Sequence, residues 1–186
     1  MKSLRLAICA SFLAAPLAQA HPHAFVGTQM ALTVDGGAVT AIEMTWVYDA
    51  FSSLMILGDR GLDPDGDGVL TPDELAALKG FDVTNWPEDF AGDIFFESGG
   101  TPVALGDPEA LDIAVDDMGR IVARHRRSVP EVPVDALTIR QFDPTYYIAY
   151  SLDGPVAVSG DCRADVAPHD PEAAMQAVET ELSNTP

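Results

Sequence analysis

The sequence predicts an α+β fold, a mainly antiparallel β-sheet or sandwich with a helical insertion that carries an EF-hand-like loop. Short runs of alternating apolar and polar residues, separated by glycine, proline and aspartate, cover much of the chain and indicate antiparallel strands. Apart from the last residues, helix signals are confined to about residues 49–96, where an acidic twelve-residue loop lies. We therefore expect one β domain with a helical piece inserted between early strands.

Residues 1–20 have the pattern of a cleavable signal peptide. Lys2 and Arg5 form a basic start, the apolar run at 6–17 is too short to span a bilayer, and Ala18-Gln19-Ala20 is a small-x-small cleavage site. Cleavage after Ala20 makes His21 the first residue of a single domain, 21–186. We expect a secreted protein that is soluble in the periplasm and not embedded in the membrane after processing.

Charge and cysteine content restrict the classes of partner. The 186 residues carry a formal net charge of −19, so nucleic acid and anionic membrane surfaces are poor partners and cations are favourable ones. Loss of Cys9 with the signal peptide leaves Cys162 without an internal disulfide partner. A single thiol in an oxidising compartment is buried, paired with another molecule or a metal ligand.

The expected strands begin with a β-hairpin. Residues 24–34 and 39–48 alternate in hydropathy on either side of the turn signal Asp35-Gly36-Gly37. Beyond Gly99-Gly100 the pattern predicts further strands, with the fourth and fifth forming a pair that is broken at Asp143-Pro144. These strands are 101–105, 111–115, 120–129, 136–142, 146–152 and 155–159.

The insertion is expected to contain three short helices. A helix over 51–57 precedes the acidic loop, and another runs from Pro72 to about Lys79 and stops at Gly80. Trp86, Phe90 and Ile94 are spaced four residues apart and predict a third helix. Outside the insertion, residues 170–181 predict a terminal helix or a partly disordered acidic tail.

The acidic loop, residues 63–74, fills each defining position of an EF-hand calcium loop. Gly68 occupies the sixth position, where the chain must turn sharply. The alternative is an acidic, glycine-rich surface turn, and no second loop is present to pair with this one. The expected calcium ligands are the side chains of Asp63, Asp65 and Asp67, the backbone carbonyl of Val69, Thr71 through water, and both carboxylate oxygens of Glu74.

A second candidate metal site lies at the processed terminus, His21-Pro22-His23. His21 would offer an α-amino group and an imidazole to one ion, and His23 a second imidazole; such ligands suit zinc, nickel or copper. Pro22 has no N–H to lose, which disfavours a square-planar site built on successive backbone amides. The alternative is a remnant of signal processing. Candidates for a third ligand are His125, Cys162 and His169.

No catalytic group stands out, and we do not predict an enzyme. Asp49 and Asp143 are candidate carboxylates, but the sequence pairs neither with a base or a nucleophile.

Four motifs in order resemble the bacterial family called domain of unknown function 1007. The motifs are the Ala-His-Pro-His-Ala-Phe junction at 20–25, Met-Thr-Trp-Val-Tyr-Asp at 44–49, the acidic loop, and Phe-Asp-Pro-Thr-Tyr-Tyr at 142–147. The resemblance implies a periplasmic component of an uncharacterised ABC-type transport system, encoded beside nickel/cobalt-type or zinc-linked metal transporters. It also implies that His21 and His23 match the His-Pro-His of the family, and it supplies no reaction.

Three functions remain open at this point. The leading expectation is a periplasmic protein that holds zinc, nickel or copper and delivers it to or from a membrane transporter, with a structural calcium loop. The second is a calcium-stabilised structural or interaction module without a transition metal. The third is a copper oxygenase with a histidine brace, in which the amine and ring of His21 and one further ring bind copper.

Overall fold

The computed structural model describes residues 22–87 and 90–167 of the chain. The long first strands are joined by the predicted turn, in which Gly36 and Gly37 take positive φ values of 57° and 82°. The elements are β1 (Ala24–Asp35), β2 (Ala38–Tyr48), α1 (Ala50–Asp59), α2 (Pro72–Leu78), β3 (Ile94–Ser98), β4 (Thr101–Val103), β5 (Glu109–Val115), β6 (Ile121–Pro133), the 3-10 helix η1 (Val134–Ala136), β7 (Leu137–Gln141), β8 (Ile148–Leu152) and β9 (Ala157–Val158).

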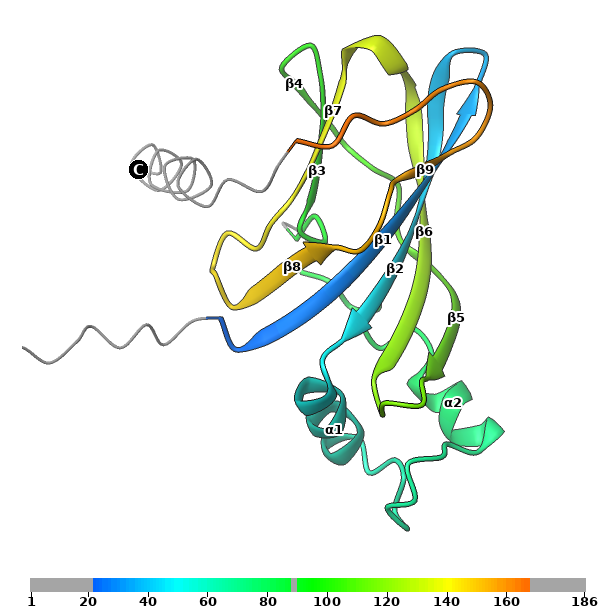
Figure 1. Ribbon diagram of the computed structural model, residues 1–186, viewed down its shortest axis with the longest axis vertical. Helices are drawn as coiled ribbons and strands as arrows, with labels where there is room; N and C mark the ends of the chain where they lie inside the picture. The colour runs from blue at the N-terminus through cyan, green and yellow to red at the C-terminus, as the bar shows by residue number, and fades with distance from the viewer. Residues whose placement is uncertain (1–21, 88–89, 168–186) are drawn as a thin grey trace, which may run out of the picture.

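The strands form two sheets (Figure 1). The larger sheet has the order β5-β6-β2-β1-β8, with β9 also paired to β1, and the smaller sheet has the order β4-β3-β7. All neighbours are antiparallel except β8 and β9, which run parallel to β1. The predicted β-hairpin and the mainly antiparallel class are therefore confirmed, and the two parallel pairings were not anticipated.

The main core lies against one face of the large sheet. Alternate residues of β1 and β2 are buried there, and they pack with Ile94 and Phe96 of the small sheet. This alternation is the period-2 pattern of a strand with one covered face. The residues of the two long strands that belong to this core are Val26, Met30, Leu32, Val39, Ile42, Met44 and Trp46.

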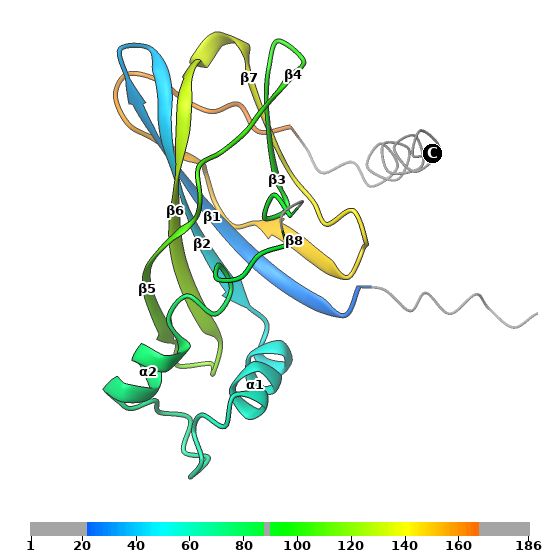
Figure 2. The ribbon, with the colours of Figure 1, turned by 180° about the vertical axis from the view of Figure 1, so that it is seen from behind.

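A second, smaller core attaches the helical insertion to one end of the large sheet (Figure 2). Leu57 of α1, Leu78 of α2 and Ile121 of β6 form it together with Leu70 from the acidic loop. The buried hydroxyl of Ser53 also accepts a hydrogen bond from the backbone N–H of Ile121 at 2.9 Å. The insertion is thus attached to one end of β6.

Two predictions of secondary structure were wrong. Ile94 begins strand β3, and the described residues between 86 and 93 contain no helix, because Gly92 and Asp93 adopt positive φ values of 76° and 55° that an α-helix does not allow. Strands β7 and β8 do not pair with each other: β7 pairs with β3, and β8 pairs with β1. The predicted terminal helix at 170–181 lies outside the described residues.

Candidate metal centre

The acidic loop connects the two helices of the insertion. Helix α1 ends at Asp59, Gly61 turns the chain at a φ of 64°, and Asp63 itself has a φ of 55°. Leu70 is 8% exposed and packs into the small core, which fixes the far side of the loop. The tip between these two points is exposed to solvent.

The Asp63 carboxylate organises the backbone of the loop. It accepts hydrogen bonds from the backbone N–H of Asp67 at 3.1 Å and from that of Gly68 at 3.2 Å. Gly68 has a φ of 77°, a conformation that favours glycine, so the predicted sharp turn is present. The Asp67 carboxylate accepts from the N–H of Val69 at 2.8 Å. The carboxylate at the first loop position therefore holds the backbone of the loop in its turn.

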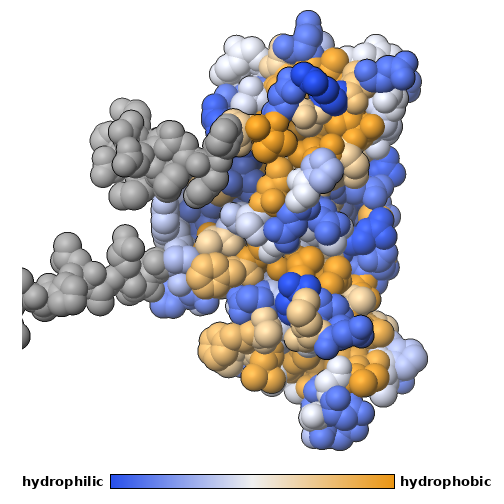
Figure 3. Space-filling view, in the orientation of Figure 1, coloured by the Kyte–Doolittle hydropathy of each residue, from blue (hydrophilic) through white to orange (hydrophobic). Residues whose placement is uncertain are grey.

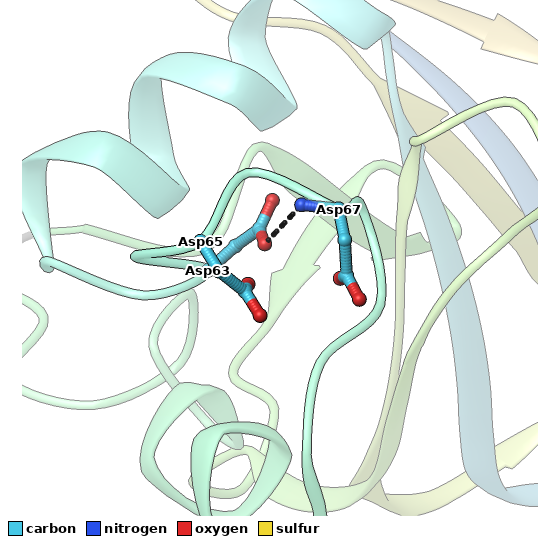
Figure 4. Close-up of side chains that lie close together, drawn as sticks. All are labelled: Asp63, Asp65 and Asp67. Atoms are coloured by element: carbon cyan, nitrogen blue, oxygen red, sulfur yellow. Dashed lines mark hydrogen bonds between the residues drawn. The ribbon is translucent and has the colours of Figure 1, made fainter.

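Three carboxylates converge on the interior of the loop. One oxygen from each of Asp63, Asp65 and Asp67 lies within 4.8 Å of the others, and Figure 4 shows the three groups between the two arms of the loop. Hard oxygen ligands of this kind suit calcium. Among the described residues, this is the one group of three acidic, histidine or cysteine side chains with such spacing.

Glu74 closes the loop on its other side. Its Oε1 accepts from the N–H of Asp63 at 3.1 Å, and its Oε2 accepts from the N–H and the hydroxyl of Thr71, both at 2.8 Å. The Thr71 hydroxyl accepts in turn from the N–H of Glu74, which completes the predicted capping box of α2. The bonds from Thr71, followed by the bond from Asp63, hold the pKa of Glu74 below its ordinary value, so the group stays ionised. Calcium coordination would require Glu74 to exchange the capping bonds for the ion.

His23 lies exposed at the start of the large sheet. Its backbone N–H donates to the carbonyl of Tyr147 at 2.8 Å, and its ring lies 5.0 Å from the Tyr147 ring, centroid to centroid. The histidine is therefore attached to the sheet by its backbone and placed beside an aromatic ring. His21, its predicted partner, and His169 lie outside the described residues.

His125 is placed in the core, not at the surface. It is 1% exposed on the inner face of β6, and its ring meets the Trp46 ring edge-on at 4.5 Å. Burial, followed by the charge of Arg127, lowers its pKa from 6.5 to about 4, so the imidazole is neutral at pH 7. Within the described residues it belongs to no group of three potential ligands. His125 is therefore a buried core residue, and the structure does not place it with His23 in one metal site.

The arginines around His125 divide between the two faces of β6. Arg124 points outward and pairs with Asp112 at 2.7 Å and Glu43 at 3.3 Å. Arg127 points inward, donates to the carbonyls of Gly106 and Ala91, and lies over the Trp86 ring at 5.3 Å. The bonds to these carbonyls, together with the charge of Asp107, compensate the burial of the guanidinium.

Cys162 is half-buried after β9, where it lines a groove of about 1240 Å³. The groove lies between the two sheets, and its walls are mostly aliphatic side chains such as Val34, Val39 and Ile139. Among the described residues, neither His23 nor His125 lines it with Cys162. The structure thus places His23, His125 and Cys162, the three described candidates for histidine or cysteine metal ligands, at different sites.

Both candidate catalytic carboxylates have structural hydrogen bonds. Asp49 caps α1 by accepting from the N–H of Ser52, and it also accepts from the N–H of Phe25, both at 2.9 Å. Asp143 accepts from the N–H groups of Thr145 and Ile148 at 2.7 and 2.8 Å and so fixes the turn before β8.

Sequence reasoning missed a buried acidic group that lies immediately before β3. Asp93 is 4% exposed and accepts a 2.8 Å hydrogen bond from the Tyr150 hydroxyl. Burial raises its pKa to about 6, against the opposing effect of the Tyr150 bond. A single aspartate after Gly92 carries no recognisable sequence signal, because its burial depends on strands that are distant in the chain.

These features define a mainly β, two-sheet protein with a helix-bounded acidic loop and an exposed histidine at the start of its central hairpin. The chain belongs to the family described as Protein of unknown function (DUF1007), whose model matches residues 6–186. The resemblance expected from the motifs is therefore confirmed. A comparison with curated proteins gives no match. Within the described residues, no helix has the length and apolar character needed to cross a membrane.

Proposed function

We propose that the protein is a periplasmic metal-binding protein that holds zinc, nickel or copper at its processed N-terminus. It delivers this ion to or from a membrane transporter, and the acidic loop binds a structural calcium ion. The signal-peptide pattern supports the location, and the His21-Pro22-His23 terminus on a chain of net charge −19 supports the preference for cations.

The observation that carries the proposal is the placement of His23. The backbone bond to Tyr147 and the contact between the two rings hold this histidine at the end of a sheet while its side chain stays exposed. A ligand that is already ordered loses less conformational freedom when it binds an ion. His21 follows the predicted cleavage site and lies two residues away in the sequence, so the processed terminus would carry three nitrogen donors within three residues.

Nitrogen ligands select among metals. Imidazole suits zinc, copper and nickel, whereas calcium prefers oxygen. The terminus and the acidic loop therefore differ in ligand chemistry and would take different ions. A fourth ligand would come from water or from the receiving transporter, which would leave the ion open to exchange.

The test compares two forms of the protein that differ only at the N-terminus. One form begins at His21, and the other is extended by an acetyl group on the His21 nitrogen, which removes the α-amino ligand and keeps both imidazoles. Calorimetric titration with zinc, nickel and copper should show weaker binding by the extended form, by roughly tenfold or more. Equal affinities would place the site elsewhere.

A second function is favoured by the attachment of the loop. Leu70 attaches the loop to the small core, and the Asp63 hydrogen bonds hold the backbone of the loop, so calcium alone could stabilise the insertion as a structural or interaction module. Calcium-dependent thermal stability without binding of any transition metal would establish this alternative.

A further inference from the structure

The exposed side of α1 is unusually apolar for a surface helix. Phe51, Leu54 and Met55 are 67%, 66% and 49% exposed, while Ser53 and Leu57 on the opposite side are buried in the protein. We call these three exposed side chains the α1 face. Surface helices normally carry polar residues on the side away from the core, yet residues 50–58 include no charged residue at all.

The three side chains form one continuous stripe. Positions i, i+3 and i+4 of a helix lie on one side, which is the spacing of the anchor residues that a helix inserts into a groove on another protein. The space-filling view shows apolar surface over α1 (Figure 3). Exposed apolar stripes that include an aromatic side chain are typical of interaction sites.

Charge at the end of α1 indicates what kind of partner fits. Asp59 ends the helix, and the acidic loop with Asp63, Asp65 and Asp67 follows directly. Arg60 is the one cation between them, and its guanidinium lies over the Phe81 ring at 5.3 Å. A bound calcium ion would offset two of the loop's negative charges and leave the region acidic. An anionic lipid surface is repelled by such a region, and a second copy would bring like charges together.

The α1 face is also close to the start of the sheet. The backbone N–H of Phe25 donates to Asp49, the N-cap of α1, and the N–H of Asp49 donates to the carbonyl of Phe25, both at 2.9 Å. Phe25 is 56% exposed and is two residues from His23. A protein bound to α1 would therefore approach the histidine terminus.

We propose that the α1 face docks into an apolar groove, bordered by lysine or arginine residues, on a partner protein. The apolar stripe fills the groove and the acidic loop meets its basic border. Identifying this partner with the transporter that exchanges the metal rests on the proposed function. The docking chemistry itself does not require a metal.

The test uses a helical peptide with leucine on one face and lysine on the other as a substitute for the basic groove. A second peptide, with glutamate in place of lysine, reports on charge. The variants are Leu54→Gln and Met55→Gln, and the matched control is Val134→Gln. Val134 is 36% exposed and follows the end of β6 opposite to the end that contacts α1. Circular dichroism confirms that each variant is folded.

Fluorescence anisotropy at about 0.15 M salt should show that the lysine peptide binds the unmodified protein and the glutamate peptide does not. Each variant in α1 should weaken binding roughly tenfold, and Val134→Gln should leave it unchanged. Equal binding by all variants would mean attraction by net charge alone and would overturn the proposal. So would a dimer that Leu54→Gln dissociates, or binding to phosphatidylcholine vesicles, because either would assign the α1 face to a different occupant.

Metal titration of Leu54→Gln separates this inference from the proposed function. A variant that has lost peptide binding and retains its metal supports docking at a site distinct from the ion. Peptide binding without any transition metal would remove the proposed function and leave the docking surface in place.

Discussion

Glu74 and Asp63, the last and first positions of the acidic loop, are joined by a hydrogen bond from the Asp63 N–H to the Glu74 Oε1 at 3.1 Å. The same carboxylate also caps α2 through Thr71. One side chain thus links the closure of the loop to the start of the following helix. If calcium draws both oxygens of Glu74 to itself, the ion takes over this link.

Calcium affinity should depend on the charge and both oxygens of Glu74. We predict that Glu74→Gln weakens calcium binding roughly tenfold to a hundredfold, because an amide cannot close the site as a bidentate anion. Calorimetric titration measures the change. Asp73→Asn is the matched control, since it removes the same charge from the adjacent residue. An equal loss in this control would mean that the loop attracts calcium only by its net charge.

His125 should make the fold sensitive to acid. Its pKa is 6.5 when unfolded and about 4 when folded, so the unfolded state binds more protons between these values and stability falls as the pH drops through this window. Because Asp82 and Asp93 have pKa values raised to about 6, they act in the opposite direction below pH 6.

A comparison with His125→Leu isolates the contribution of the imidazole. The difference in the free energy of unfolding between the two proteins should shift by about 3 kcal/mol in favour of the variant between pH 7 and pH 4. Urea denaturation at a series of pH values measures this difference. A difference that does not change with pH would show that His125 is not held neutral by burial.

Gly92 should not tolerate a side chain. A Cβ at this position would collide with the Trp86 ring, and the φ of 76° is itself unfavourable for alanine. We predict that Gly92→Ala destabilises the fold by about 2 kcal/mol or more. Gly58→Ala is the control, because Gly58 lies within α1 with no atom near its missing Cβ and should gain up to about 1 kcal/mol. Equal effects in chemical denaturation would contradict this account.

Local patterns predicted the elements whose cause is local. The Asp35-Gly36-Gly37 turn and the alternation on either side predicted the β1–β2 hairpin, and Thr71 with Glu74 predicted the capping box. The helix expected near Trp86 failed because the four-residue spacing of aromatic residues also fits a turn leading into a buried strand. In the structure, the rings of Trp86 and Phe90 still meet edge-on, with their centroids 5.1 Å apart.

Pairings between distant segments could not be read from the sequence. Strands β7 and β8 are adjacent in the chain with a turn between them, yet β8 joins β1 in parallel register, starting with Ala24 opposite Ile148. The burial of His125 could not be predicted for the same reason. Strand alternation defines the two faces of β6 but does not show which face the small sheet covers. The three clustered carboxylates of the acidic loop were easier to locate, since the spacing of Asp63, Asp65 and Asp67 is a property of one loop.

The most direct test of the central claim is elemental analysis of the protein purified from the periplasm in the form that begins at the predicted His21 terminus, followed by competition titrations with zinc, nickel, copper and calcium. We predict one transition metal per chain, lost when His21 and His23 are changed to alanine, with calcium binding unaffected. Calcium as the sole bound metal would contradict the claim and would establish the calcium-stabilised module in its place.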